Sequence, residues 1–331
     1  NLGILEDKYG SVWLLNSPGL LLWNKETNKF SAYGNEINKK HISFSSAWQL
    51  RESDIGIWVA TNNIGLLLFK SDQYNEREIK GNSSVFSQEN RGLASNRIAF
   101  TLEDSFGRFW VSHHDEGIQV FESEKSFISK KSKEVVWFNQ NTKEEQFRIP
   151  DRSARTLFME SNGSVWGGTF TKGIIQLSDS SGNFNVWKPK SSDGLEYAHQ
   201  DIRDIYESSN HDFWIATYGG GIIHWDRKAK KSQIITSKNG LSNDFTYAIL
   251  VQNDSTLWIP TNNGLSKFDT KSGQVHIYTE SDGLQNNEFN TGAFYKGKSG
   301  KMYVGGVNGV NYFTPNEVLE SEINAQISIV S

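Results

Sequence analysis

The 331-residue chain exceeds the length at which a single hydrophobic core usually stops growing, which indicates two domains or a repeat architecture. Its 11 Trp, 11 Tyr and 20 Phe favour pleated strands, and 29 glycines beside 5 prolines indicate many tight turns. A formal charge of -4 without a long basic run argues against nucleic acid as a partner, and the absence of cysteine excludes disulfides, thiolate zinc sites and cysteine nucleophiles.

A repeated unit runs through the whole chain. Each copy has an aromatic anchor inside a short apolar strand, then a glycine, then a second strand. Successive anchors lie 44 to 56 residues apart, and they are Trp13, Trp58, Trp110, Trp166, Trp214, Trp258 and Tyr303.

Within a unit, alternation of apolar and polar residues predicts four strands. The first strand of the chain is expected at 2–6. In the third unit we expect strands at 97–103, 109–112 and 117–121, with a turn at 104–107, whereas the fourth strand is clearest in the sixth unit, at 275–278. The alternating tail at 325–330 either supplies the last unit's fourth strand or, as 325–331, begins a following module.

Units of this length with four strands each are typical of β-propeller blades. The sequence therefore predicts an all-β fold, a seven-bladed β-propeller of four-stranded antiparallel blades over residues 1–324. The anchor rings are expected to fill the space between blades rather than to stack on carbohydrate. No stretch approaches the ~18 apolar residues of a membrane span, and a chain that opens at Asn1 without a signal segment is expected to be a mature or excised piece of a longer protein.

Several strings resemble the sensor propellers of bacterial hybrid two-component histidine kinases. They are residues 282–290 and 305–313 with Pro315 in the last two units, and residues 102–111 and 239–244 in earlier ones. The resemblance covers the chain from end to end and is looser in the second and fourth units. Units one and five depart from the pattern, with Pro18 in a loop and residues 209–212 in place of the usual Asp-x-x-Gly turn.

The resemblance implies a periplasmic sensor module without catalytic residues or cofactors. In that family two tandem propellers precede an immunoglobulin-like module, a membrane helix and a cytoplasmic kinase. The implied partners are a glycan-derived ligand such as an oligosaccharide or sugar acid, the neighbouring propeller and immunoglobulin-like module, and a second copy in a homodimer. Related propellers also precede diguanylate cyclases, so the output domain stays open.

Two other functions remain open beside the sensor. The string at 147–150, Phe-Arg-Ile-Pro, matches the arginine motif of sialidases, and residues 7–13 and 104–110 resemble their Asp boxes, which raises a glycan-active enzyme of the sialidase or lyase type. In sialidases that motif precedes the first Asp box, whereas here it follows three units. A protein-interaction propeller is the third reading.

Two further clusters carry weaker signals. The run 113–116, His-His-Asp-Glu, is the densest set of metal-ligand types, but consecutive loop residues rarely converge on one ion, so no metal is expected. The glycines at 219–221 lie between two strands and indicate a turn, not a phosphate loop.

Ligand contacts are expected on the loops that join second to third strands and on those that enter each first strand, because a rigid propeller gathers these loops on one face. Aromatic, arginine and amide side chains suit a sugar acid. The candidates are His113, His114, Asp115, Arg152, Arg155, Phe170, Lys172, Tyr197, His199, Tyr218, Asn262 and Asn263.

Overall fold

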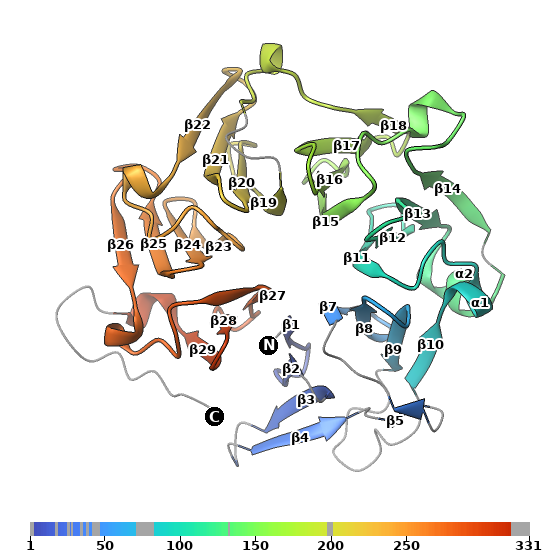
Figure 1. The fold of residues 1–331 in the computed structure, drawn as a ribbon, viewed down its shortest axis with the longest axis horizontal. Helices are drawn as coiled ribbons and strands as arrows, with labels where there is room; N and C mark the ends of the chain where they lie inside the picture. The colour runs from blue at the N-terminus through green and yellow to red at the C-terminus, as the bar shows by residue number, and fades with distance from the viewer. Residues whose placement is uncertain are drawn as a thin grey trace. The chain divides into compact units, whose positions relative to one another are not determined.

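The computed structural model describes residues 3–16, 19–24, 27, 29–33, 36–37, 40–41, 47–70, 83–131, 133–196 and 201–318. Within this part of the chain seven sheets follow the seven sequence units (Figure 1). Six have four strands, and the seventh has three described strands. The expected closing strand at 325–330 lies outside the described residues.

The first three sheets are β1–β4 (Gly3–Glu6, Val12–Asn16, Gly19–Asn24, Lys29–Tyr33), β7–β10 (Ala47–Glu52, Gly56–Thr61, Leu66–Lys70, Ser83–Phe86) and β11–β14 (Ile98–Glu103, Phe109–His113, Ile118–Phe121, Glu134–Phe138). The next three are β15–β18 (Ala154–Met159, Val165–Thr169, Ile174–Ser178, Phe184–Trp187), β19–β22 (Ile202–Glu207, Phe213–Thr217, Gly221–Asp226, Lys231–Ile235) and β23–β26 (Leu250–Asn253, Thr256–Thr261, Gly264–Asp269, Val275–Tyr278). The last is β27–β29 (Phe289–Lys296, Met302–Gly306, Gly309–Phe313).

Short elements connect or extend these sheets. They are the hairpin β5–β6 (Glu36–Ile37, Lys40–His41), the helices α1 (Gln88–Arg91) and α2 (Glu124–Ile128), and the single 3-10 turns η2 (Glu145–Phe147), η3 (Ser191–Asp193), η4 (Ser237–Asn239), η5 (Glu280–Asp282) and η6 (Pro315–Glu317). Among the described residues no helix combines the length and the hydropathy needed to cross a bilayer.

The chain forms two compact units. The central unit comprises residues 60–66 and 86–235, and the terminal unit comprises 1–59, 67–85 and 236–331. In the central unit the first strands β11, β15 and β19 are neighbours, and in the terminal unit β23 lies beside β27, β27 beside β1, and β1 beside β7. Successive antiparallel sheets whose first strands are neighbours are the blades of a propeller. The fold is a seven-bladed β-propeller, as the repeat predicted.

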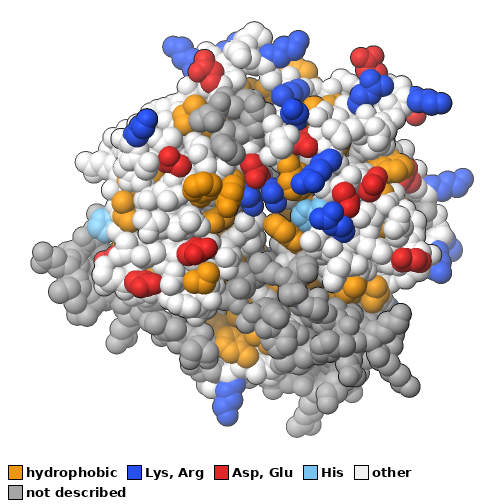
Figure 2. All heavy atoms as spheres, in the orientation of Figure 1, with side chains coloured by type: hydrophobic (Ala, Val, Ile, Leu, Met, Phe, Trp, Pro, Cys, Tyr) orange, Lys and Arg blue, Asp and Glu red, His pale blue; other side chains and the backbone are white. Residues whose placement is uncertain are grey.

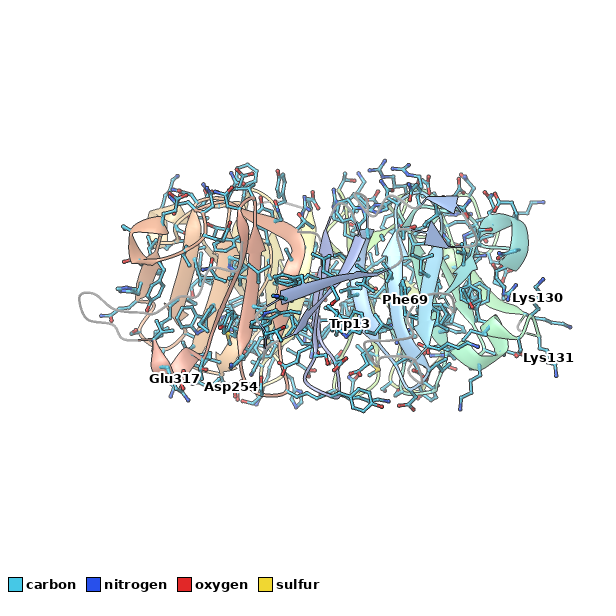
Figure 3. The ribbon with its side chains drawn as sticks, turned by 90° about the horizontal axis from the view of Figure 1, so that it is seen from below. Trp13, Phe69, Lys130, Lys131, Asp254 and Glu317 are labelled. Carbon is cyan, nitrogen blue, oxygen red and sulfur yellow. The ribbon has the colours of Figure 1, made fainter. Side chains whose placement is uncertain are left out.

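The seven anchors lie in the cores of their sheets. Their exposed fractions are 5 % or less, which confirms the prediction that the rings pack inside. In Figure 3 Trp13 lies within the layer of strands, whereas Lys130 and Lys131 extend from the outer edge. A buried tryptophan of this kind removes ~150–250 Å² of mainly apolar surface from water, so the anchors are a large share of each core.

An acidic turn residue holds the anchor of the same blade. In the third blade Asp104 Oδ1 accepts hydrogen bonds from the backbone N–H of Phe106 and Arg108, at 3.0 and 2.9 Å. Its Oδ2 accepts the indole N–H of Trp110 at 2.8 Å. One carboxylate therefore fixes the turn and satisfies the polar atom of a buried ring.

The same spacing of six residues recurs in other blades. Trp13, Trp166 and Trp258 donate their indole N–H to Asp7, Glu160 and Gln252 at 2.7, 2.9 and 3.0 Å. The fifth blade has Ser208 at this position, and its anchor Trp214 instead stacks on His224 with ring centroids 4.1 Å apart. Its turn places His211 at φ 65, in the left-handed region that Gly10, Gly107, Gly163 and Gly300 occupy in the equivalent turns of other blades. The departure noted in the sequence therefore changes the turn and leaves the sheet intact.

Candidate ligand-binding site

Three neighbouring blades of the central unit place equivalent residues on one set of loops. Phe170, Tyr218 and His114 each follow the second strand of their blade directly, after β16, β20 and β12. The backbone N–H of His114 donates to the carbonyl of Arg97 at 2.8 Å, and that of Tyr218 donates to Asp201 at 2.9 Å. In the third and fifth blades these bonds join the end of the second strand to the residue that precedes the first strand, so the two loop types lie together.

The ring of Phe170 is the centre of the cluster in the fourth blade. The guanidinium carbons of Arg155 and Arg152 lie 4.0 and 4.6 Å from its centroid, and His114 of the preceding blade meets it edge-on at 5.9 Å. Only 7 % of Phe170 is exposed. Cations are attracted to the face of an aromatic ring, so Phe170 attracts both guanidinium groups, although their like charges repel each other.

The fifth blade repeats this arrangement. Arg203 lies over Tyr218 at 4.1 Å, at the strand position that corresponds to Arg155. Asp201 joins the two blades: its Oδ1 accepts from Arg155 Nε at 2.8 Å and its Oδ2 from Arg203 Nη2 at 3.1 Å. Burial lowers the pKa of Arg155, and the neighbouring Arg203 adds to the effect, while Asp201 opposes it.

The third blade contributes an imidazole and an exposed ion pair. Burial, and then the charges of Arg155 and Arg97, lower the pKa of His114 to about 4, so its ring is neutral at pH 7. Arg97 Nη1 pairs with Asp115 Oδ2 at 3.0 Å. The cluster thus contains four arginines and two aspartates and carries a net positive charge. Figure 2 shows basic side chains, a histidine and hydrophobic side chains gathered over the inner strands of this unit.

Arg152 and Arg97 are the two exposed arginines of the cluster, and Arg152 differs from Arg97 in its partners. Its guanidinium has no carboxylate partner among the residues that the structure describes, whereas Arg97, Arg155 and Arg203 each have one. The backbone carbonyl of Arg152 accepts the N–H of Gly117 at 2.9 Å, which fixes the loop, and the side chain is exposed. A planar guanidinium of this kind is suited to a carboxylate, sulfate or phosphate group.

His113 has a different role from its neighbour. Its side chain is fully buried, with Nδ1 3.0 Å from the carbonyl oxygen of Ser95 and Nε2 2.9 Å from Oε1 of Gln119. Burial lowers its pKa to about 4, against hydrogen bonds to Gln119 and Ser95 that raise it. The ring ties β12 to β13 and to the loop before β11, and it has no surface to offer a ligand.

The buried histidine makes stability depend on pH. The unfolded chain takes up a proton near pH 6.5 and the folded chain only near 4, so the unfolded state holds more protons between these values. The free energy of unfolding is therefore expected to fall as the pH drops through this window, by up to ~3 kcal/mol from His113. Urea titrations from pH 7 to 4.5 measure it. The decline should be shallower in His113→Gln, and parallel curves for the two proteins would contradict the assignment.

The remaining sequence candidates are Lys172, Asn262, Asn263, Tyr197 and His199. Lys172 is exposed, and its backbone N–H donates to Thr169 Oγ1 at 2.9 Å. Asn262 and Asn263 belong to the terminal unit, where Asn262 Oδ1 accepts the hydroxyl of Tyr247 at 2.8 Å. Tyr197 and His199 lie outside the described residues.

Three members of the cluster were not among the sequence candidates: Arg97, Asp201 and Arg203. The repeat carries a signal for Arg203, which occupies in β19 the position that Arg155 occupies in β15. Arg97 and Asp201 each immediately precede a first strand, but the residue at that point differs from blade to blade, so alignment of the units does not single them out.

The side chains of the sialidase-like string make local structural contacts. Arg148 of the sialidase-like string donates from Nε and Nη2 to the carbonyl of Thr142 at 3.3 and 3.1 Å, and Phe147 packs edge-on against Phe138. In the described part of the chain no three His, Asp or Glu side chains converge as metal ligands.

No protein-family model matches the chain. Histidine kinase P4 from Formosa agariphila is 24% identical over 313 residues, which are 93% of this chain and 22% of that protein.

Two solved structures show the same fold. One, described as the extracellular domain of the hybrid two-component system BT3049 from B. thetaiotaomicron, has a TM-score of 0.71 at 20% identity over 95% of this chain and 39% of that chain. The other, a virginiamycin B lyase from Staphylococcus aureus, has a TM-score of 0.63 at 14% identity over 92% of this chain and 91% of that chain. The chain spans less than half the length of the kinase and of the BT3049 domain, and it shares the propeller fold of extracellular domains of two-component systems, with sequence similarity to a histidine kinase along nearly all of its length.

Proposed function

We propose that this chain is an extracytoplasmic, non-catalytic sensor module of a membrane-bound two-component receptor, and that it binds an anionic glycan fragment at the Phe170 cluster. Similarity to a histidine kinase and the shared fold with extracellular receptor domains support the receptor role. The observation that carries the ligand class is that the exposed Arg152 and the partly buried Arg155 both pack against the ring of Phe170.

The chemistry of the cluster favours a sugar acid over a neutral sugar. A carboxylate or sulfate can accept hydrogen bonds from Arg152 while ring hydroxyls reach Asp115 and the loop backbone. Phe170 and Tyr218 pack against the arginines, so the local dielectric there is lower than that of water. Hydrogen bonds between an arginine and an anionic ligand are stronger in such surroundings.

Signalling would follow from a shift between domain arrangements. The cluster joins loops of three blades, so a ligand that contacts all three changes the free energy of any state in which those loops move. Tandem propellers, an immunoglobulin-like module and a partner copy in the full receptor are the elements on which this shift would act. The ligand needs different affinities for the two arrangements, since equal affinities shift nothing.

Calorimetry on the 331-residue chain tests the ligand class. We expect saturable binding of an oligosaccharide that carries uronic acid or sulfate groups, and at least tenfold weaker binding to Arg152→Ala, about 1.4 kcal/mol. Arg148→Ala is the matched control, because that exposed guanidinium bonds a surface loop, and its affinity should equal that of the wild type. Equal loss in both variants, or no binding by any acidic glycan, would refute the proposal.

A glycan-active lyase is the second candidate, because a propeller lyase shares the fold over most of both chains. Prolonged incubation of the same oligosaccharides with micromolar protein separates the two functions. A sensor leaves the glycan unchanged, whereas a lyase accumulates unsaturated products that absorb in the ultraviolet. Accumulation of such products would replace the sensor proposal.

A further inference from the structure

A cavity lies in the central unit between the sheets β15–β18 and β19–β22. Its volume is about 240 Å³. The lining combines aromatic rings with polar side chains, chiefly Trp166, Trp187, Trp225, Gln176, Arg227 and Lys230. None of these residues belongs to the Phe170 cluster, and Trp166 is the repeat anchor among them.

At the preceding boundary, between the sheets β11–β14 and β15–β18, aromatic rings pack against the anchor. There Phe138 stacks on the anchor Trp110 at 5.8 Å with an interplanar angle of 11°, and Phe184 packs edge-on at 5.7 Å. Val120 lies directly opposite Trp110 in the sheet. The anchor ring is therefore covered by apolar groups, and the boundary is a closed core.

At the cavity the same row of the sheet is partly polar. The residue opposite Trp166 is Gln176, and the residue opposite Gln176 is Trp187, whose exposed fraction is 38 %. Trp187 and Trp225 meet Trp166 edge-on, at 78° and 81°, so neither lies flat on it. Gln176 thus stands where the third blade has Val120, and its side-chain amide has no hydrogen-bond partner among the described residues.

The charged groups of the lining balance. Glu160 accepts Trp166 Nε1 at 2.9 Å and pairs with Arg227 Nη2 at 2.5 Å, so these two charges neutralise each other within the wall. Asp193 and Lys230 add one further charge of each sign. The lining of the cavity therefore carries no net charge and favours a neutral ligand, whereas the arginine cluster carries a positive charge.

From this lining we infer that the cavity binds one neutral sugar ring. The apolar face of a pyranose can lie against Trp187, and its hydroxyls can both donate to and accept from Gln176 and donate to Asp193. The volume is below the ~300 Å³ at which pockets for drug-sized ligands begin, which suits a single ring. An extended proline-rich peptide, the other common partner of tryptophans, needs a groove several residues long. The inference concerns a neutral ligand at other residues, so it stands separately from the proposed function.

Methyl glycosides of glucose, galactose, mannose and xylose are the probes. Added to the 331-residue chain, at least one is expected to perturb tryptophan fluorescence saturably and to give saturation-transfer signals from one face of its ring. Trp187→Ala should weaken this binding at least about tenfold. Trp137→Ala is the matched control, because Trp137 also lies on an outer strand and is 37 % exposed, and it should leave the affinity unchanged.

A second variant guards against a folding artefact. Gln176→Val introduces the residue that the third blade has opposite its anchor, so it should fold with an unchanged melting temperature and lose sugar binding. Arg152→Ala should retain it, which separates this cavity from the acidic-glycan site. The inference is overturned if no methyl glycoside binds at its solubility limit, if Trp187→Ala binds as tightly as the wild type, or if a proline-rich peptide competes for Trp187.

Discussion

Replacing Asp104 by alanine is expected to lower the free energy of unfolding by about 3–5 kcal/mol. The change removes the acceptor for two turn amides and for the buried indole N–H of Trp110, and it removes the ion pair to Arg108, whose Nε lies 2.6 Å from Asp104 Oδ2. Loss of one partner of a buried pair leaves the other polar groups desolvated and unpaired, which costs more than the bond itself contributes.

Urea unfolding followed by tryptophan fluorescence measures this loss, with Asp179→Ala as control. Asp179 makes the same turn, accepting from the N–H of Ser181 and Asn183 at 2.8 and 3.0 Å, but it is exposed and holds no anchor indole. Its replacement should therefore cost much less. Similar losses for the two variants would mean that the turn, and not the indole bond, is what Asp104 contributes.

Sequence periodicity predicted most of the fold because each blade repeats one local pattern. The expected strand at 275–278 coincides with β26, and the expected 97–103 begins one residue before β11. The helices α1 and α2 were not predicted: each is about one turn long, too short for a helical period to emerge. The bond from Asp104 to Trp110 was also missed, although the spacing of six residues is visible in several units.

The site was predictable to the extent that it repeats. Phe170, Tyr218 and His114 were candidates because they follow second strands. Arg155 was a candidate because it was expected in the loop that enters a first strand, and the structure places it in β15. Strand alternation did not separate His113 from His114, because β12 ends between them: His113 turns into the sheet toward Gln119, while His114 faces Phe170. Which arginines share a carboxylate depends on contacts across blades, and these contacts are set by tertiary packing.

The Asp201→Asn variant is expected to be less stable than the wild type and to bind an anionic ligand more tightly. Asp201 balances Arg155 and Arg203, whose side chains are only 19% and 7% exposed. Without the carboxylate these partly buried cations repel each other, and the free energy of unfolding should fall by about 2–3 kcal/mol. An anionic ligand that binds the cluster would take over part of this balance, so its affinity should rise several-fold and it should raise the melting temperature more than in the wild type.

Thermal shift and calorimetry with the same acidic oligosaccharide measure both effects. Asp212→Asn serves as control, since Asp212 pairs with His224 at 3.1 Å on another part of the fifth blade and should change neither affinity nor the ligand-induced shift. Because the asparagine keeps the shape of the side chain, a gain in affinity would have to come from the lost charge. Weaker binding by Asp201→Asn would contradict this prediction. It would mean that Asp201 mainly holds Arg155 and Arg203 in position for the ligand, and that the anionic group of the ligand does not compete with the Asp201 carboxylate.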